Sequence, residues 1–566
     1  MTRDSYFRSG GEIPLLVDTI PEHFNRIVRK FPDHEAVVSL PQGKRLTYSR
    51  FAEEIDLLAR GLMGCGFGKG DRIGIWSTNN LEWVLVQMAA ARIGVILVNI
   101  NPAYRLRELA YALKKSEVQG LFVIPSFKSS DYVSMLVELL PELQSGGKQE
   151  IDSSELPFLR RVILFDPACA METQRPWSGF SVWQDVIRAA GAVSRKEMEE
   201  QAAGLDANDS VNIQYTSGTT GFPKAVVLTH HNILNNAWFT GEIMHFSEDD
   251  SLCVAVPFYH CFGTVLASLL CFCRGSCLVI ACDHFDPYLV LRAVEKEQCT
   301  ALHGVPTMFI AELDHPQFAD IDISSLRTGI MAGAPCPELL MKRVMEEMGC
   351  REILIGYGET EASPLTHLTR PEDDMEKRTR TVGTNLPYQE AKIIDTADGS
   401  TVSVGRTGEL CFRGYHIMKA YYNDPEATAE AIDEEGWLHS GDLGVMDENG
   451  YVSITGRLNE MIIRGGENIY PREIEEVIFN HPQVSDVAVF GVPDDYWGEE
   501  IMAWIILHPG GRLSAEEIRD FCRASLAHFK IPRYIHFVDE FPMTVTGKVQ
   551  KFRMRETAIR EMNQKG

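Results

Sequence analysis

Apolar residues in the first third of the chain follow a helical period and a strand period in turn. Phe51, Ile55, Leu58 and Leu62 recur at helical spacing and form one apolar face of a predicted helix. The pattern then predicts a strand over 72–76, a helix capped by Asn79 or Asn80 that runs to about residue 91, a buried strand over 93–100 and a helix over 106–113. Such alternation predicts right-handed βαβ crossovers and a mostly parallel sheet with helices on both faces.

The rest of the chain divides into three further parts. A second βα series runs over 251–357, and short strands separated by Gly and Asp turns over 383–422 predict a small β-barrel-like region. After residue 457 a compact α+β segment contains predicted strands over 484–492 and 534–538 and a capping box formed by Ser514 and Glu517. We therefore predict an α/β fold with a large domain over 1–457 and a small mobile domain over 458–566.

One apolar stretch, 251–273, contains no charged residue and is long enough to span a bilayer. Pro257, His260 and Gly263 interrupt it, which favours a buried strand, loop and helix. The segment 1–14 has no apolar run of signal-peptide length. The thirteen cysteines include no C-x-x-C pair, a usage typical of a reducing compartment, so we predict a cytoplasmic protein.

The net charge of −25 disfavours a nucleic-acid partner or a general binder of anionic membranes. Contact of a local surface patch with a membrane and formation of a homodimer are alternatives that the sequence leaves open.

A loop between two apolar segments holds three hydroxyls, two glycines and a lysine. Glycines permit a tight turn that exposes N–H groups, and hydroxyls and an ammonium add donors, so the loop is suited to hold phosphate. In a Walker A loop, Gly-Lys is followed by Ser or Thr and then by a helix. Here Pro223 precedes Lys224 and a strand follows, so the loop is not of the Walker A type. The loop is Thr216, Ser217, Gly218, Thr219, Thr220, Gly221, Phe222, Pro223 and Lys224.

At these residues the chain resembles the adenylate-forming superfamily of acyl-CoA synthetases, luciferases and peptide-synthetase adenylation domains. Later motifs follow in matching order from about residue 47 to residue 551. The segments 461–471 and 528–532 are most similar to bacterial fatty-acyl-CoA synthetases and mitochondrial medium-chain acyl-CoA ligases.

The resemblance implies the nucleotide contacts. Tyr357-Gly358-Glu359-Thr360-Glu361 resembles a Tyr-Gly-x-Thr-Glu motif, in which Tyr357 packs on adenine, Thr360 meets a phosphate and Glu361 binds Mg²⁺. Glu359 departs from the usual apolar or hydroxyl residue. Gly333, Ala334 and Pro335 resemble an adenine wall.

The segment 439–444 resembles the superfamily's ribose motif, in which the Asp442 carboxylate accepts both protons of the ribose diol. Arg457 matches a nearby contact with ribose or phosphate.

Pro257 to Gly263 resembles the gate of an acyl pocket, so we predict that His260 lines the acyl channel, with Gly304 and Met308 as further pocket residues. The apolar character of these segments favours an aliphatic or aryl acid over an amino acid.

The small domain is expected to serve two steps in turn. By resemblance, Lys548 bridges the carboxylate and the α-phosphate during adenylation, and Asn459 stands at the hinge position, where Asp or Lys is commoner. The CoA-facing loop is Arg464, Gly465, Gly466 and Glu467.

The resemblance implies an ATP- and Mg²⁺-dependent acid–CoA ligase that converts a carboxylic acid, expected to be a medium- or long-chain fatty acid, through an acyl-adenylate to acyl-CoA. We assign catalysis to Lys548, Thr216, Glu361 and His260. Two alternatives stay open: transfer of the acyl group to a carrier protein, and a non-catalytic nucleotide-binding homologue, to which Ala225, Glu359 and Asn459 point as departures from the superfamily pattern.

Overall fold

The computed structural model describes residues 3–144, 151–216, 223–464, 467–494, 496–523, 525–543 and 549–565. The chain divides into two compact units. The larger unit is Arg8–Glu390 with Phe412–Leu438, and the smaller is Met1–Phe7 with Ala391–Cys411 and His439–Gly566. The predicted domain boundary at 457/458 and the mobility of the small domain stay predictions.

The first sheet of the larger unit has eight strands, and its central strands are parallel as predicted. Asn80 caps the helix that follows the first predicted strand, since its side chain accepts the Trp83 N–H. Gly94 ends that helix in the left-handed conformation, so the next strand begins at Ile96 and not at residue 93. The strand order is β10 (Ser181–Val182), β9 (Arg161–Leu164), β6 (Gly120–Val123), β4 (Arg72–Trp76), β5 (Ile96–Ile100), β11 (Ser210–Thr216), β12 (Lys224–Thr229) and β22 (Ala420–Tyr421).

Helices and short elements of this half join those strands. The predicted apolar face of α2 is buried, with Phe51, Ile55, Leu58 and Leu62 at most 2% exposed. The helices are α1 (Ile20–Lys30), α2 (Tyr48–Gly64), α3 (Leu81–Ile93), α4 (Leu106–Lys115), α5 (Tyr132–Leu139), α6 (Trp183–Ala189), α7 (Arg195–Ala202) and α8 (His230–Ile243). The short elements are strands β7 (Ser126–Phe127) and β8 (Ser130–Asp131) and the 3-10 turns η1 (Pro141–Leu143), η2 (Ala170–Glu172) and η3 (Ala190–Ala192).

The second sheet of the larger unit has nine strands and a parallel centre from β2 to β17. The strand order is β19 (Thr384–Asn385), β18 (Leu365–Leu368), β17 (Glu352–Gly358), β16 (Thr328–Ala332), β15 (Ala301–His303), β13 (Ser251–Val254), β14 (Cys277–Ile280), β2 (Glu35–Ser39) and β3 (Lys44–Thr47). Its helices and turns are α9 (Cys261–Gly263), η4 (Thr264–Leu269), α10 (Leu270–Arg274), α11 (Pro287–Glu297), α12 (Pro306–Leu313), η5 (Phe318–Asp320), α13 (Glu338–Glu346), η6 (Thr360–Ala362) and α14 (Met375–Arg380). A further helix, α15 (Pro425–Ala431), contacts β22 of the first sheet.

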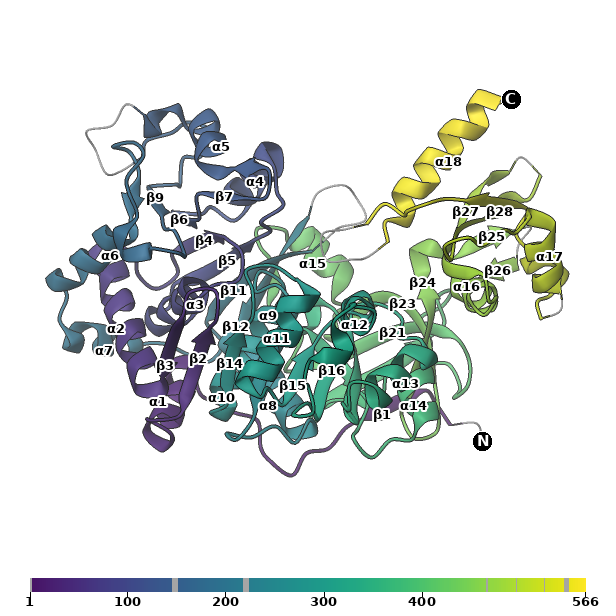
Figure 1. The fold of residues 1–566 in the computed structure, drawn as a ribbon, viewed down its shortest axis with the longest axis horizontal. Helices are drawn as coiled ribbons and strands as arrows, with labels where there is room; N and C mark the ends of the chain where they lie inside the picture. Colours follow the sequence, from purple (N-terminus) through teal and green to yellow (C-terminus); the bar gives the residue numbers. More distant parts are fainter. Residues whose placement is uncertain are drawn as a thin grey trace. The chain divides into compact units, whose positions relative to one another are not determined.

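The two sheets share one apolar core. Helix α8 contacts β12 of the first sheet and β18 of the second, and α1 contacts α2, α3 and α10. Helices α11, α12 and α13 pack in sequence against the nine-stranded sheet, with α11 against β13 and α13 against β17 (Figure 1). This arrangement leaves the carboxyl ends of the parallel strands to the loops that carry the predicted motifs.

The apolar stretch over 251–273 forms a buried strand, loop and helix, as predicted. The helix continues through a π-helical segment, η4, between α9 and α10. Within the described part of the chain, no helix combines the length and the apolar character that crossing a membrane requires.

Two five-stranded sheets lie wholly or mostly in the smaller unit. One has the order β1 (Tyr6–Arg8), β20 (Gln389–Ile394), β21 (Gly408–Gly414), β23 (Leu438–Met446) and β24 (Val452–Arg457). Short strands do form over 383–422, as predicted, but only β20 and β21 belong to this sheet, whereas β19 and β22 extend the two large sheets. The second holds β26 (Glu467–Ile469), β25 (Ile462–Arg464), β28 (Gly498–Leu507), β27 (Val484–Asp494) and β29 (Tyr534–Phe537). Around it lie η7 (Leu458–Glu460), α16 (Pro471–Phe479), α17 (Ala515–Arg523), η8 (His528–Lys530) and α18 (Lys551–Lys565).

The predicted capping box opens α17. The Ser514 N–H donates to Glu517 Oε2 at 2.8 Å, and the Glu517 N–H donates to Ser514 Oγ at 3.3 Å.

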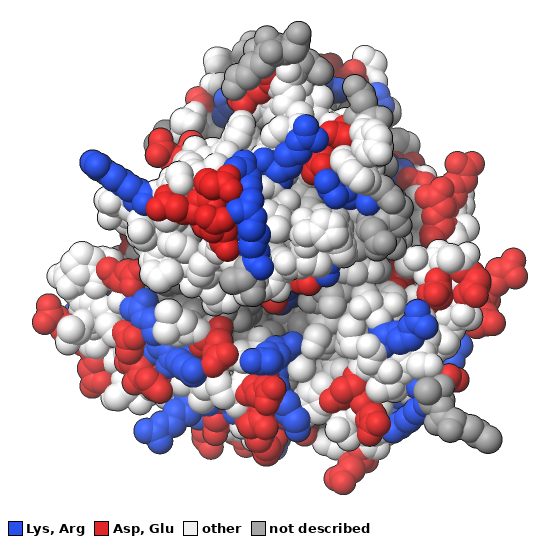
Figure 2. Space-filling view, turned by 90° about the vertical axis from the view of Figure 1, so that its right-hand side faces the viewer, with Lys and Arg blue, Asp and Glu red and all other residues white. Residues whose placement is uncertain are grey.

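Acidic side chains lie among basic ones on the face drawn in Figure 2, so the acidic excess is not gathered into one area of that face.

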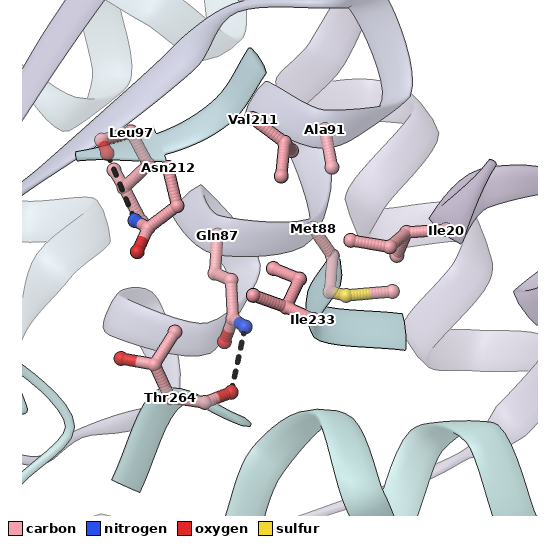
Figure 3. A pocket seen from close by; sticks show the side chains of 9 residues that line it. All are labelled: Ile20, Gln87, Met88, Ala91, Leu97, Val211, Asn212, Ile233 and Thr264. Carbon is pink, nitrogen blue, oxygen red and sulfur yellow. Dashed lines mark hydrogen bonds between the residues drawn. The ribbon is translucent and has the colours of Figure 1, made fainter. Parts of the chain in front are cut away.

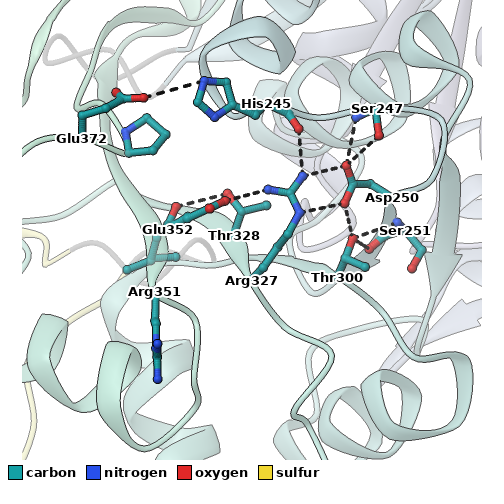
Figure 4. Close-up of polar contacts among 12 residues, drawn as sticks. His245, Ser247, Asp250, Ser251, Thr300, Arg327, Thr328, Arg351, Glu352 and Glu372 are labelled. Atoms are coloured by element: carbon teal, nitrogen blue, oxygen red, sulfur yellow. Dashed lines mark hydrogen bonds and ion pairs between the residues drawn. The ribbon is translucent and has the colours of Figure 1, made fainter.

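An ion-pair network joins the amino ends of the nine-stranded sheet (Figure 4). Arg327 precedes β16 and contacts Asp250 before β13 and Glu352 at the start of β17, both at 2.7 Å. Hydrogen bonding to Arg327 opposes the effect of burial and holds the pKa of Asp250 below its usual value. These ion pairs join the amino ends of the strands, while the carboxyl ends of the same strands lead into the motif loops.

A buried carboxyl group lies within α12. Glu312 is 1% exposed, and neither side-chain oxygen has a hydrogen-bond partner among the described residues. Burial raises the pKa of Glu312 well above its usual range, because an ionised carboxylate loses hydration there.

We expect Glu312→Gln to stabilise the protein above neutral pH. With its folded-state pKa raised, Glu312 adds most stability below its unfolded pKa of about 4.3, and that stability is lost as pH rises toward the folded pKa. Urea denaturation should show that the free energy of unfolding rises on the order of 1–3 kcal/mol at pH 8, and that this gain shrinks toward pH 5. Glu346→Gln, at an exposed position on α13, is the matched control. A gain independent of pH would contradict this account.

Candidate active site

The predicted phosphate loop joins two strands, as expected, and the structure shows that these strands are antiparallel. Thr216 ends β11, Lys224 begins β12, and the two residues pair across the hairpin. The Tyr111 hydroxyl donates to the Pro223 carbonyl at 3.2 Å, which ties the second stem to α4. The predicted phosphate contacts over 217–222 lie outside the described residues.

Glu361 meets the first stem of this loop. It lies in the 3-10 turn Thr360–Ala362 directly after β17, and its backbone carbonyl accepts the Met418 N–H at 2.7 Å. The Thr216 hydroxyl donates to Glu361 Oε1 at 3.4 Å. Folding therefore brings together a hydroxyl and a carboxylate that are 145 residues apart, both oxygen donors of the kind that suits Mg²⁺.

Tyr421 contacts two of the predicted site residues, and sequence reasoning did not single it out. Its hydroxyl donates to Glu361 Oε1 at 2.8 Å, and Lys224 Nζ lies 4.7 Å from its ring centroid. Burial and then the Glu361 charge raise the pKa of this phenol, so it stays a donor. Tyr421 belongs to β22, which pairs with β12, but no local motif marks it.

The predicted adenine residues lie at the carboxyl ends of neighbouring parallel strands. Gly333 follows β16 with φ of +86°, a conformation that favours glycine. Tyr357 lies near the end of β17, and its ring centroid is 6.2 Å from those of His367 and Phe412. Ala334 and Pro335 continue the loop after Gly333, and Glu359 is half-buried between Gly358 and Thr360.

Gly358 has no room for a side chain. A Cβ added there would lie 1.9 Å from the Pro364 carbonyl oxygen, because β17 and β18 are shifted in register at this residue. The glycine thus lets the chain turn from β17 into the segment that carries Thr360 and Glu361.

His260 lies in the loop between β13 and the helix that follows. Its Nδ1 accepts the Phe262 N–H at 3.2 Å, so His260 caps the helix that starts at Cys261. Cys261 Sγ lies 3.6 Å from both His260 Nδ1 and Thr360 Oγ1. The gate segment therefore contacts the nucleotide motif directly.

The two other predicted pocket residues lie together at the adjacent strand. Gly304 follows β15 and forms an isolated bridge with Met331. A Cβ placed on Gly304 would be 3.5 Å from Met308 Cβ. The role of His260, Gly304 and Met308 in an acyl channel stays a prediction.

A small buried cavity lies one helical turn beyond His260 along the same helix (Figure 3). The polar groups on its wall are paired with protein: Gln87 Nε2 donates to the Thr264 carbonyl at 3.1 Å, and Asn212 Nδ2 donates to the Leu97 carbonyl at 2.9 Å. Its lining is otherwise apolar, which suits an empty packing space better than a polar ligand. The lining residues are Ile20, Gln87, Met88, Ala91, Leu97, Val211, Asn212, Ile233 and Thr264.

In the smaller unit, Asp442 on β23 pairs with Arg457 on β24. Arg457 Nε lies 3.2 Å from Asp442 Oδ1, and the Asp442 side chain is 14% exposed. The pairing orients the carboxylate and brings together two residues predicted to hold ribose or phosphate. Asn459, the predicted hinge residue, is exposed in the 3-10 turn Leu458–Glu460.

The predicted CoA-facing loop is a hairpin. Arg464 on β25 pairs with Glu467 on β26, and between them Gly465 and Gly466 lie outside the described residues. Arg464 contacts Glu500 Oε1 at 2.7 Å and lies over the Trp497 ring. Lys548, the predicted catalytic lysine, also lies outside the described residues. On either side of that segment, Met543 and Val549 form an isolated β-bridge.

Comparison with known proteins places these motifs in a family context. The family model "AMP-binding enzyme" matches residues 24–422, and the model of its C-terminal domain matches residues 473–548. The putative acyl-CoA synthetase YngI of Bacillus subtilis is 47% identical over 97% of this chain and 98% of its own. The mitochondrial medium-chain acyl-CoA ligase ACSF2 of Danio rerio is 40% identical over 99% of this chain and 91% of its own.

Among solved structures, the anthranilate CoA ligase AuaEII in complex with anthranoyl-AMP superposes with a TM-score of 0.83 at 25% identity, over 98% of this chain and 99% of that one. The resemblance inferred from the motifs is thereby confirmed over nearly the whole chain, as is the predicted α/β fold.

Proposed function

Because this chain belongs to the AMP-binding enzyme family, we propose that it is a Mg²⁺-dependent acid–CoA ligase that activates a medium-chain fatty acid through an acyl-adenylate. The observation that carries this proposal is the meeting of Thr216, Glu361 and Tyr421 at the stem of the phosphate loop. The chain length rests on the name of the ACSF2 relatives and on the apolar gate segment.

The carboxylate nucleophile is ionised at neutral pH, so the reaction needs no general base. Catalysis must come from positioning the two substrates and from stabilising charge on the α-phosphate. Thr216 and Lys224 stand at the two ends of the phosphate loop. Tyr357 and the segment after Gly333 flank adenine. The Asp442 carboxylate accepts hydrogen bonds from the ribose hydroxyls.

Glu361 and the Thr216 hydroxyl fit Mg²⁺, since both supply hard oxygen atoms beside the phosphate loop. When bound, Mg²⁺ would neutralise phosphate charge. Tyr421 holds Glu361 in place, and Lys224 adds positive charge on the same side.

The finer parts of the proposal rest on separate arguments. Lys548 supplies the cation for adenylation, and the hairpin of Arg464 to Glu467 faces CoA in the second step. A cytoplasmic location is supported by the thirteen cysteines, all of which are free. Peripheral membrane contact and a homodimer stay predictions.

The direct test is AMP release with ATP and Mg²⁺ across acetate, octanoate, palmitate and benzoate, each with and without CoA. We expect strong CoA-dependent turnover with octanoate. Pyrophosphate release without CoA-dependent turnover would favour a carrier-protein acceptor. Silence on every acid would overturn the ligase proposal for these acid classes and favour a nucleotide-binding homologue.

Tyr421→Phe should lower kcat/KM for ATP by roughly 10- to 150-fold, because a hydrogen bond to a charged carboxylate contributes about 1.5–3 kcal/mol. Tyr421→Leu should cost more, since the ring beneath Lys224 is also lost. Steady-state kinetics at several Mg²⁺ concentrations check both variants. Tyr422→Phe, next in the chain but bonded through its hydroxyl to Glu117, is the matched control. Equal effects at both tyrosines would contradict a specific role for Tyr421.

A further inference from the structure

Three potential metal ligands of different chemistry meet in the smaller unit, on the sheet of β1, β20, β21, β23 and β24. Glu409 and Cys411 are alternate residues of β21 and so lie on one face of that strand. His439 lies near the start of the neighbouring strand, β23. One donor atom from each residue lies within 4.8 Å of the other two.

Two of the three distances between donor atoms are close to those of a tetrahedral zinc site. His439 Nδ1 lies 3.1 Å from Glu409 Oε2 and 3.7 Å from Cys411 Sγ. Zinc bond lengths of about 2.3 Å to sulfur and about 2.0–2.2 Å to nitrogen or oxygen give tetrahedral edges of about 3.6 Å for S···N and about 3.3 Å for N···O. Small side-chain shifts would therefore place all three atoms around one ion.

The three groups differ in their exposure to solvent, and the most exposed of them gives an ion access to the site. Cys411 is fully buried and Glu409 is 8% exposed, whereas the His439 side chain is 31% exposed. An ion would approach from the histidine side and keep its fourth position for water. The Gly441 N–H donates to Glu409 Oε1 at 3.1 Å, which orients the carboxylate and leaves Oε2 turned toward His439.

We propose that Glu409, Cys411 and His439 form a binding site for a borderline-soft divalent cation of the zinc class. The combination of thiolate, imidazole and carboxylate selects Zn²⁺ or Co²⁺ over Mg²⁺, which prefers oxygen ligands alone. Binding converts the Cys411 thiol to a thiolate and releases its proton to solvent, so affinity falls as pH falls. The site is distinct from Glu361, which belongs to the larger unit.

Cobalt titration of the full chain tests the site without relying on enzyme activity. The exposed Cys169 is first replaced by Ser, because it is a competing thiol. We expect one equivalent of Co²⁺ to produce thiolate-to-cobalt charge-transfer absorption that Zn²⁺ abolishes. Cys411→Ser should remove this band, and His439→Gln should weaken binding by about tenfold or more.

Cys522→Ser is the matched control, since it removes one buried thiol elsewhere in the same unit and should leave the band intact. Far-UV circular dichroism shows whether each variant folds; if Cys411→Ser does not, His439→Gln and Glu409→Gln decide the outcome. Persistence of the band in folded Cys411→Ser, unchanged affinity in both other variants, or absence of any band at millimolar cobalt would overturn the proposal. The cluster would then be only a hydrogen-bonded His–Glu pair beside a buried thiol.

Discussion

Lys548→Ala is expected to slow adenylate formation by roughly 10²–10³-fold, because it removes the cation placed at the reacting carboxylate and α-phosphate. Thioester formation from supplied acyl-adenylate and CoA should stay near the unsubstituted rate, since the proposed second step uses the other face of the small domain. Acid-dependent exchange of pyrophosphate into ATP measures the first step, and CoA consumption with supplied adenylate measures the second.

Two further variants separate the charge of Lys548 from its geometry. Lys548→Arg keeps the charge but replaces a compact ammonium by a planar guanidinium, so partial activity is expected. Lys196→Ala removes an 84% exposed lysine of the larger unit and should change neither step. Equal loss of both half-reactions in Lys548→Ala would refute the assigned role.

Glu361→Gln is expected to reduce adenylation by at least about 10²-fold and to raise the Mg²⁺ concentration needed for half-maximal rate. The amide keeps the size of the side chain and an oxygen for Tyr421, but it loses the charge that attracts the ion. Pyrophosphate exchange measured across a Mg²⁺ series would show both effects.

The matched control for Glu361 is Glu376→Gln, at a 76% exposed carboxylate of the same unit. A Glu361→Gln variant with a lower rate but an unchanged Mg²⁺ requirement would show that the carboxylate positions Thr216 or Tyr421 and does not hold the metal. Such a result would leave the ligase proposal standing and remove only the metal assignment.

The local signals in the sequence predicted local structure well. The apolar face of α2, the Asn80 cap of α3 and the Ser514–Glu517 box each depend on residues within a few turns of one another, and all are present. The start of β5 was less well predicted: a buried apolar run continues across Gly94, and only the left-handed glycine marks where helix changes to strand.

The site divides in the same way. Thr216, Lys224, Thr360 and Glu361 were singled out as candidates because they stand in short motifs of glycines, hydroxyls and charged groups that resemble those of the superfamily. Tyr421 was missed because its role depends on pairing between β12 and β22, whose residues are almost 200 positions apart in sequence. The contacts expected of Lys548 and of residues 217–222 stay predictions, because these residues lie outside the described part of the chain.

By itself, the sequence determined the alternation of helices and strands, the family motifs and their order, since these depend on short-range periodicity, backbone freedom and side-chain chemistry. Only the tertiary structure decided which distant groups meet: Thr216 and Tyr421 at Glu361, the buried and unpartnered carboxyl of Glu312, and the cluster of Glu409, Cys411 and His439. The physical reason is that strand order and register, which bring such residues within a few ångströms, are set by the packing of the whole core and not by neighbours in the chain.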